Sequence, residues 1–136
     1  MSGKNSNRFL YILRAVPGAG KSTLAESITP NICCADDFLM EDGEYKWAVE
    51  KLYKAHKSCE DLCRTFMECQ EEKIVVANTN AHLSDMKAYE LLAKEFDYTV
   101  FHLIIENRHG GIDSHNVADS TKEKMANAIK QNMKLI

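Results

Sequence analysis

AVPGAGKS, residues 15–22, is the stretch of sequence that decides the fold. It follows Phe9–Ala15, where aromatic and aliphatic residues predict a strand, and it opens Lys21–Ile28, which predicts a short helix. A glycine-rich turn between a strand and a helix start lets backbone N–H groups converge on phosphate. The stretch therefore predicts a phosphate-binding loop.

Four residues shape the backbone of this loop, namely Pro17, Gly18, Ala19 and Gly20. The proline stiffens the turn, and the two glycines allow torsions and a close approach that larger side chains prevent. Ala15 stands where the motif usually begins with glycine, but a methyl group is a small addition at that position. We expect the four residues to line the bound phosphates.

Three polar side chains at the end of the loop have expected roles in phosphate chemistry. Lys21 is expected on the β- and γ-phosphates of a nucleotide. Ser22 has the hydroxyl that holds Mg²⁺ in such loops, and Thr23 adds a second hydroxyl nearby. The loop thus predicts binding of ATP or GTP, and we expect ATP with Mg²⁺.

Beyond the loop, strand-like and helix-like segments alternate along the chain. Alternation of this kind implies parallel pairing through right-handed crossovers, with ligands at the carboxyl ends of the strands. The expected fold is α/β, a three-layer P-loop NTPase or kinase-like fold with a small, mainly parallel sheet of about four strands flanked by helices. We predict further strands at Asn31–Ala35, Ile74–Ala77 and Tyr98–Ile105, helices at Tyr45–Cys69, Leu83–Phe96 and from Ser120 (in a capping box with Glu123) to the end, and loops at Asp36–Glu44 and Asn107–Asn116.

Length and composition fit one compact domain of 136 residues. Residues 1–7 are polar and indicate a flexible lead-in, so we expect the domain over 8–136. The net charge of −3 argues against tight non-specific binding to nucleic acid, which needs clustered basic side chains. Arg14 interrupts the apolar run Phe9–Val16, so neither a signal peptide nor a membrane helix is expected.

The five cysteines form no CxxC pair, and their odd number favours reduced thiols in a cytoplasmic compartment. Cys33 and Cys34 fit a buried strand. His56, Cys59 and Cys63 recur at helical spacing and are able, in principle, to share a metal ion. No fourth ligand is evident and the same positions continue an apolar stripe, so we prefer a role in the core.

Polar side chains follow the second and third predicted strands. Asp36 and Asp37 are expected at the mouth of the site, where one carboxylate is able to accept a proton from an attacking hydroxyl. A turn or a helix cap explains this pair equally well. Asn78 and Asn80 stand where many nucleotide-hydrolysing proteins place an acid for Mg²⁺, and they are candidates for orienting an acceptor hydroxyl or phosphate.

Three other residues have two interpretations each. Arg14 is either a charge near the nucleotide or one half of a partly buried ion pair. Tyr45 and Trp47 either stack on a base or pack against the core, and packing is the commoner role of aromatic residues at a helix start. The sequence leaves both interpretations of Arg14 open and favours packing for the aromatic pair.

In this order the motifs resemble the polynucleotide 5′-kinase-like P-loop proteins of phages and animals, a family that includes a small phage type with the kinase domain alone. The resemblance covers most of the chain from Leu13 to Met125. Its pieces are LRAVPGAGKSTLA (13–25), CADDF (34–38), DGEY (42–45), the helix around Ala55-His56, VVANTN (75–80), YELLAKEFDYTV (89–100), ENRHGG (106–111) and HNV (115–117).

The resemblance implies transfer of the γ-phosphate of ATP to a 5′-hydroxyl, with single-stranded DNA or RNA ends as acceptors. It implies that Asp36 is the general base and that Lys21 and Ser22 keep their phosphate and Mg²⁺ roles. It gives Arg108 the role of a lid arginine that covers the donor phosphates and stabilises charge in the transition state. A phage-type protein would work in the cytoplasm of its host.

Two departures from the family pattern widen the choice of function. Leu39 stands where the phage kinases carry an arginine that touches the acceptor phosphate. Arg108 is the only arginine of the lid segment, which also holds His109 and His115 without an assigned step. A nucleoside or small metabolite is therefore an alternative acceptor. A non-catalytic, nucleotide-dependent binding protein is a second alternative, which the missing acid at Asn78 also favours.

Overall fold

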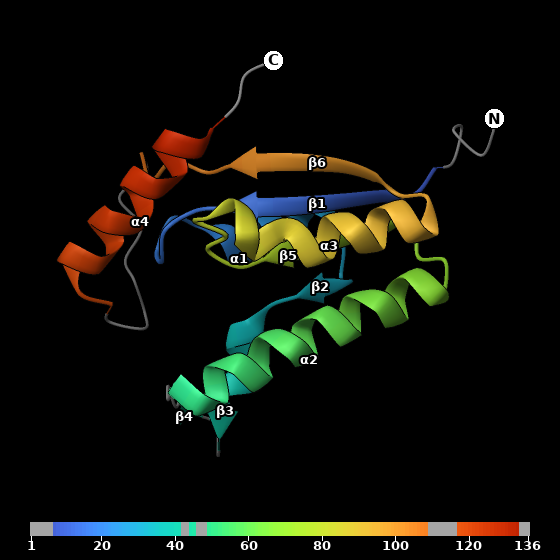
Figure 1. Ribbon diagram of the computed structural model, residues 1–136, viewed down its shortest axis with the longest axis horizontal. Coiled ribbons are helices and arrows are strands. Elements are labelled where there is room, and N and C mark those ends of the chain that lie inside the picture. Colours follow the sequence, from blue (N-terminus) through green and yellow to red (C-terminus); the bar gives the residue numbers. More distant parts are fainter. Residues whose placement is uncertain (1–6, 42–43, 46–48, 109–116, 134–136) are drawn as a thin grey trace.

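The computed structural model describes residues 7–41, 44–45, 49–108 and 117–133. Figure 1 shows α2 and α3 along one face of a sheet and α4 beyond one end of it. None of the helices within these ranges is long and apolar enough to cross a membrane. In chain order the elements are β1 (Phe9–Arg14), α1 (Lys21–Ile28), β2 (Ile32–Cys33), the 3-10 helix η2 (Ala35–Leu39), β3 (Met40–Glu41), β4 (Glu44–Tyr45), α2 (Val49–Glu68), β5 (Lys73–Ala77), α3 (Leu83–Phe96), β6 (Thr99–Ile104) and α4 (Asp119–Asn132).

Four strands form one parallel sheet in the order β2-β5-β1-β6. β1 lies inside this sheet, with Leu10 opposite Ile74 of β5 and Val100 of β6. β2 joins the other side of β5, where Cys33 is opposite Val76. The carboxyl ends of all four strands therefore meet at one end of the sheet, and the loop after β1 begins there. This confirms the predicted α/β fold with a small parallel sheet.

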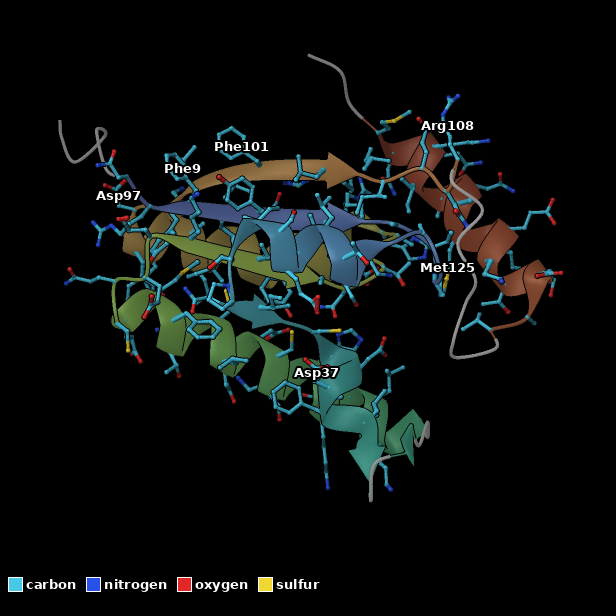
Figure 2. All side chains as sticks on the ribbon, turned by 180° about the vertical axis from the view of Figure 1, so that it is seen from behind. Phe9, Asp37, Asp97, Phe101, Arg108 and Met125 are labelled. Carbon is cyan, nitrogen blue, oxygen red and sulfur yellow. The ribbon has the colours of Figure 1, made fainter. Side chains whose placement is uncertain are left out.

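Alternating side chains of β1 build a core on each face of the sheet. Leu10 and Ile12 belong to the larger cluster, which packs against α2 and α3. Leu13 belongs to a smaller cluster that includes Ala25 of α1. Figure 1 has α2 and α3 in front of the sheet, and the reverse view in Figure 2 has α1 in front. The molecule therefore has the three layers that the sequence predicts.

α2 buries a stripe of small and sulfur-containing side chains. Ala55, Cys59, Cys63 and Met67 recur every fourth residue and are all buried. His56, by contrast, is exposed, so the prediction that it continues the apolar stripe is wrong. The helix turns about 100° per residue, which carries the position next to Ala55 away from the sheet.

The segment predicted as a loop, Asp36–Glu44, contains regular structure. Ala35–Leu39 forms η2, and Met40–Glu41 pairs antiparallel with Glu44–Tyr45. The prediction of a loop is therefore wrong over most of this segment. The physical reason is Leu39, which is 1% exposed and belongs to the larger core cluster. One buried leucine anchors the turn in spite of the acids around it.

Two other boundaries move because of the same segment. β2 covers only Ile32–Cys33, shorter than predicted, because the chain already enters η2 at Ala35. α2 begins at Val49 and not at Tyr45, whose backbone belongs to β4.

The last helix differs from its prediction at both ends. α4 begins at Asp119 and ends at Asn132, so it does not run to the end of the chain. Its N-cap is Ala118, whose carbonyl accepts the N–H groups of Thr121 and Lys122. Ser120 lies inside the helix, and the predicted capping box with Glu123 is wrong. The capping-box spacing also occurs inside helices, where the serine has no cap to make.

We predict that Leu39→Arg destabilises the protein severely, because it places a cation among the apolar side chains of the larger cluster. The free energy of unfolding should fall by about 3–5 kcal/mol, measured by urea denaturation. Leu91→Arg is the control, since that leucine is 57% exposed. For Leu91→Arg the free energy of unfolding should change by no more than about 0.5 kcal/mol. Equal urea midpoints for the two variants would contradict the anchoring role of Leu39.

Candidate functional site

The phosphate loop combines two left-handed glycines with a helix start that lacks a side-chain cap. Gly18 has φ 87° and Gly20 has φ 99°, values that a Cβ atom disfavours. Gly20 is the N-cap of α1, and no side chain hydrogen-bonds there as a cap. Ala19 is buried, and Pro17 is half-buried. The turn therefore presents backbone N–H groups and the positive end of the α1 dipole.

Lys21 lies across the loop. Its Nζ donates to the carbonyl of Ala15 at 2.9 Å, and the N–H of Ala15 donates to the carbonyl of Thr79 at 3.2 Å. Ala15 is 2% exposed, so the fold accommodates the methyl group that departs from the motif. Ser22 and Thr23 are exposed in the first turn of α1. The three polar side chains of the loop thus follow one another at the start of α1, and Lys21 is bound to the loop backbone.

The acidic pair lies directly after β2, in the first turn of η2. Asp36 is half-buried and Asp37 is exposed, and the N–H of Asp37 donates to the carbonyl of Cys34 at 3.1 Å. Partial burial raises the pKa of the Asp37 carboxyl, and the adjacent Asp36 raises it further. Two adjacent acids at the carboxyl end of a sheet, one of them harder to ionise, form an arrangement typical of acid–base sites.

Cys34 is the thiol next to these acids, and its surroundings disfavour the thiolate form. Burial, followed by the charges of Asp36 and Asp37, raises the pKa of Cys34 to about 11. All five cysteines are free thiols in the structure.

Asn78 and Asn80 are buried and connect neighbouring segments. Oδ1 of Asn78 accepts the N–H of Ala35 at 2.8 Å, which ties the end of β5 to the start of η2. Nδ2 of Asn80 donates to the carbonyl of Leu13 at 2.7 Å, and its backbone has φ 49°, which asparagine tolerates. Both amides are therefore engaged with the protein, and Asn78 holds the first residue of η2, the element that carries the acidic pair.

Arg14 is a buried cation that binds neutral oxygen atoms. It is 3% exposed, and its Nε donates to the carbonyl of Asn80 at 2.9 Å. Its Nη2 donates to the carbonyl of Ala81 at 3.3 Å and to Oδ1 of Asn132 in α4. Burial lowers the pKa of this guanidinium, and two acids of α3 act in the opposite direction. Sequence reasoning left Arg14 open and missed Asn132, which no motif contains.

Arg108 lies on the exposed chain after β6. Its Nη2 is 3.0 Å from Oε2 of Glu106, and the two side chains are 82% and 65% exposed. An ion pair so exposed contributes little to stability, so the guanidinium is able to exchange it for a phosphate. Figure 2 shows Arg108 and Asp37 well apart from one another, each beyond the carboxyl end of the strand that precedes it.

His109, His115 and Trp47 lie outside the residues that the structure describes, and the side chain of Tyr45 is likewise not described. The expectations for these four residues therefore stay predictions.

A metal site at His56, Cys59 and Cys63 finds no support in the structure. The histidine is exposed, whereas the two cysteines are buried in the core cluster. Over the described parts of the chain, no group of three histidine, cysteine, aspartate or glutamate side chains is placed to hold a metal ion. The two cysteines have the core positions that we preferred.

Sequence comparison finds a relative of much greater length. No protein-family model matches the chain. In an alignment of 96 residues that covers 67% of the chain, it is 31% identical to human NEDD4-binding protein 2. The chain spans only 5% of the length of that protein.

Two solved structures resemble the chain over most of its length. A protein from Chloroflexus aurantiacus, provisionally named a kinase, has a TM-score of 0.63 and 16% identity, covering 88% of this chain and 75% of its own. A mutant APS kinase of Mycobacterium tuberculosis has a TM-score of 0.54 and 8% identity, covering 92% and 99%. At these identities the likeness concerns architecture, and the chain has an α/β P-loop kinase-like fold.

We predict that Asp37→Asn raises the thermal stability of the protein at neutral pH. Folding raises the pKa of Asp37, so the folded state binds its proton more tightly, and stability is lost as the pH rises above the ordinary value of 3.8. The amide of Asp37→Asn stays neutral at every pH, so the variant does not lose this stability as the pH rises. Thermal unfolding should show a higher Tm for the variant at pH 7, and no difference from the wild type below about pH 3. A lower Tm of the variant at pH 7 would contradict the raised pKa.

Proposed function

We propose that the protein is an ATP-dependent kinase that transfers the γ-phosphate to a hydroxyl group, and more narrowly a polynucleotide 5′-hydroxyl kinase. One observation carries the proposal: Asp36 follows β2 at the end of the sheet where the glycine loop follows β1, with only β5 between the two strands. A proton acceptor and a phosphate cradle at one end of a parallel sheet are what transfer to a hydroxyl requires.

The residues of the loop fit Mg²⁺-ATP. Gly18 and Gly20 form a cradle that a Cβ atom would narrow, and α1 begins there without a capping side chain. The hydroxyl of Ser22, with Thr23 beside it, would hold Mg²⁺, which neutralises phosphate charge when bound. Lys21 already binds a carbonyl of the loop, from which its flexible stem is able to reach the β- and γ-phosphates.

In the proposed reaction, Asp36 is the general base. Its carboxylate takes the proton of the attacking hydroxyl while the hydroxyl oxygen forms its bond to the γ-phosphorus. The bond between that phosphorus and the bridging oxygen breaks, and ADP leaves with the electron pair. Asn78 holds the residue before Asp36 through the N–H of Ala35, which keeps the base in place.

The proposed acceptor is the 5′ end of a single strand. Phe38 is 45% exposed beside the acidic pair on η2, and an exposed aromatic ring is suited to stacking on a base of any type. The net charge of −3 fits contact with a strand end better than with a long duplex. Leu39 is buried in the core, so contact with an acceptor phosphate falls to other residues.

Asp36→Asn is expected to lower phosphate transfer by roughly 100-fold or more while ATP still binds. The amide is unable to take the proton of the acceptor, but it leaves the phosphate loop intact. Transfer of labelled γ-phosphate to a 5′-hydroxyl oligonucleotide measures the first effect, and calorimetry measures the second. Asp61→Asn, on the exposed face of α2, is the matched control and should keep the rate of the wild type.

The choice of acceptor separates the proposal from its alternatives. Transfer from ATP to single-stranded DNA or RNA supports a polynucleotide kinase, and transfer to nucleosides alone replaces it with a small-molecule kinase. Binding of ATP without product from any acceptor would contradict catalysis and favour a nucleotide-dependent binding protein. An undiminished rate in Asp36→Asn would remove that aspartate from the role of base.

Arg108→Ala is expected to lower kcat by roughly 100-fold, because its guanidinium neutralises charge that develops on the transferred phosphate. The thermal midpoint should not change, since the side chain is 82% exposed. Arg108→Lys should restore part of the rate, because it returns the positive charge. It should not restore all of it, because an ammonium group lacks the planar fork of the guanidinium. Glu106→Gln, which breaks only the ion pair, should keep the full rate. Equal kcat in wild type and Arg108→Ala would count against the role of this arginine.

A further inference from the structure

Arg14 joins three segments beside the phosphate loop. It is the last residue of β1, and its guanidinium donates to the carbonyls of Asn80 and Ala81, in the connection after β5. It also donates to Oδ1 of Asn132, the last residue of α4. Nδ2 of Asn132 donates to the same carbonyl of Ala81 at 2.8 Å. We call Arg14, Ala81 and Asn132 the clasp.

The backbone of Arg14 holds the chain that leads to Arg108. The N–H of Ile105 donates to the carbonyl of Arg14 at 3.0 Å, just after β6 ends. Figure 1 shows α4, the next helix, beyond the carboxyl ends of β1 and β6. The chain before Arg108 and the helix after it are therefore both bound to one residue, and that residue directly precedes the phosphate loop.

A purely structural role explains the clasp poorly. A guanidinium taken out of water loses hydration that the neutral acceptors and the charges of Asp85 and Glu90 in α3 restore only in part, and apolar side chains of similar volume often stabilise such a position better. What the planar fork of Arg14 adds is direction, because its N–H groups require oxygen atoms at defined angles. The clasp therefore fixes one orientation of α4 relative to β1.

We propose that the clasp positions α4 and the chain that carries Arg108 for phosphate transfer. The inference rests on the proposed kinase function and deepens it by naming Arg14 and Asn132 as positioning residues. They act through Arg108, since a small displacement of a charge-stabilising group slows the chemical step. Loss of the clasp leaves the loop between Gly18 and Gly20 unchanged, so binding of ATP persists.

Variants at Asn132 test this inference. Asn132→Ala removes the acceptor and the donor together, whereas Asn132→Asp keeps an acceptor opposite the guanidinium of Arg14. We expect kcat to fall about tenfold in Asn132→Ala, with the Kd for ATP within about threefold of wild type, and to recover largely in Asn132→Asp. Asn127→Ala, at an exposed position of the same helix, is the control and should keep the wild-type kcat.

A double-mutant cycle separates positioning from a general loss of structure. If Asn132 acts through Arg108, the substitution Asn132→Ala should have no further effect on kcat in an Arg108→Ala background. Hydrogen exchange of the Ile105 N–H should also become faster in Asn132→Ala, because its acceptor on Arg14 is held less firmly. If Asn132→Ala does not fold, the same measurements are made on Asn132→Ser.

The outcomes distinguish the two proposals. With an active wild type, equal kcat in Asn132→Ala and Asn127→Ala would overturn the positioning role and leave the kinase function standing. Additive losses in the double variant would overturn it as well, because Asn132 would then act independently of Arg108. If the wild-type protein transfers phosphate to no acceptor, the proposed kinase function is wrong, and the positioning role that rests on it is wrong as well.

Discussion

The parallel pairing of β1 on both of its sides is the constraint on which the rest of the structure depends. Leu13 is opposite Ala77 of β5 and Leu103 of β6, so the register of both ladders fixes where β1 ends. The phosphate loop starts at the next residue, Ala15, and its glycines have no side chains that could fix its position. Its position is therefore inherited from the sheet.

η2 connects the core to the candidate chemistry. A 3-10 helix has three residues per turn, so Asp36 and Leu39 lie on the same side of η2. The leucine is buried in the larger cluster and fixes the turn on which the half-buried aspartate sits. This arrangement also explains why position 39 does not present an arginine to an acceptor: the core needs an apolar side chain there.

The parts of the fold that depend on local pattern were predictable from the sequence. The glycine loop, the four strands and the long helices follow from spacing within short windows, and the fold confirms them. The contacts of Asn78, Arg14 and Asn132 were not predictable, because their partners are distant in sequence and meet only after the sheet has formed. η2 was missed because the burial of Leu39 depends on α2, a helix that lies further along the chain.

Sheet order also has a consequence for how the chain acquires its fold. β1 is synthesised first, but the strands that flank it come from the middle and the last third of the sequence. Parallel pairing over such separations is slow, because the entropy cost of closing long loops comes before any stabilising contact between the strands forms. Until β6 leaves the ribosome, Leu10 and Ile12 lack their neighbours on one side of β1, and the ladder with β5 alone fixes the start of the glycine loop.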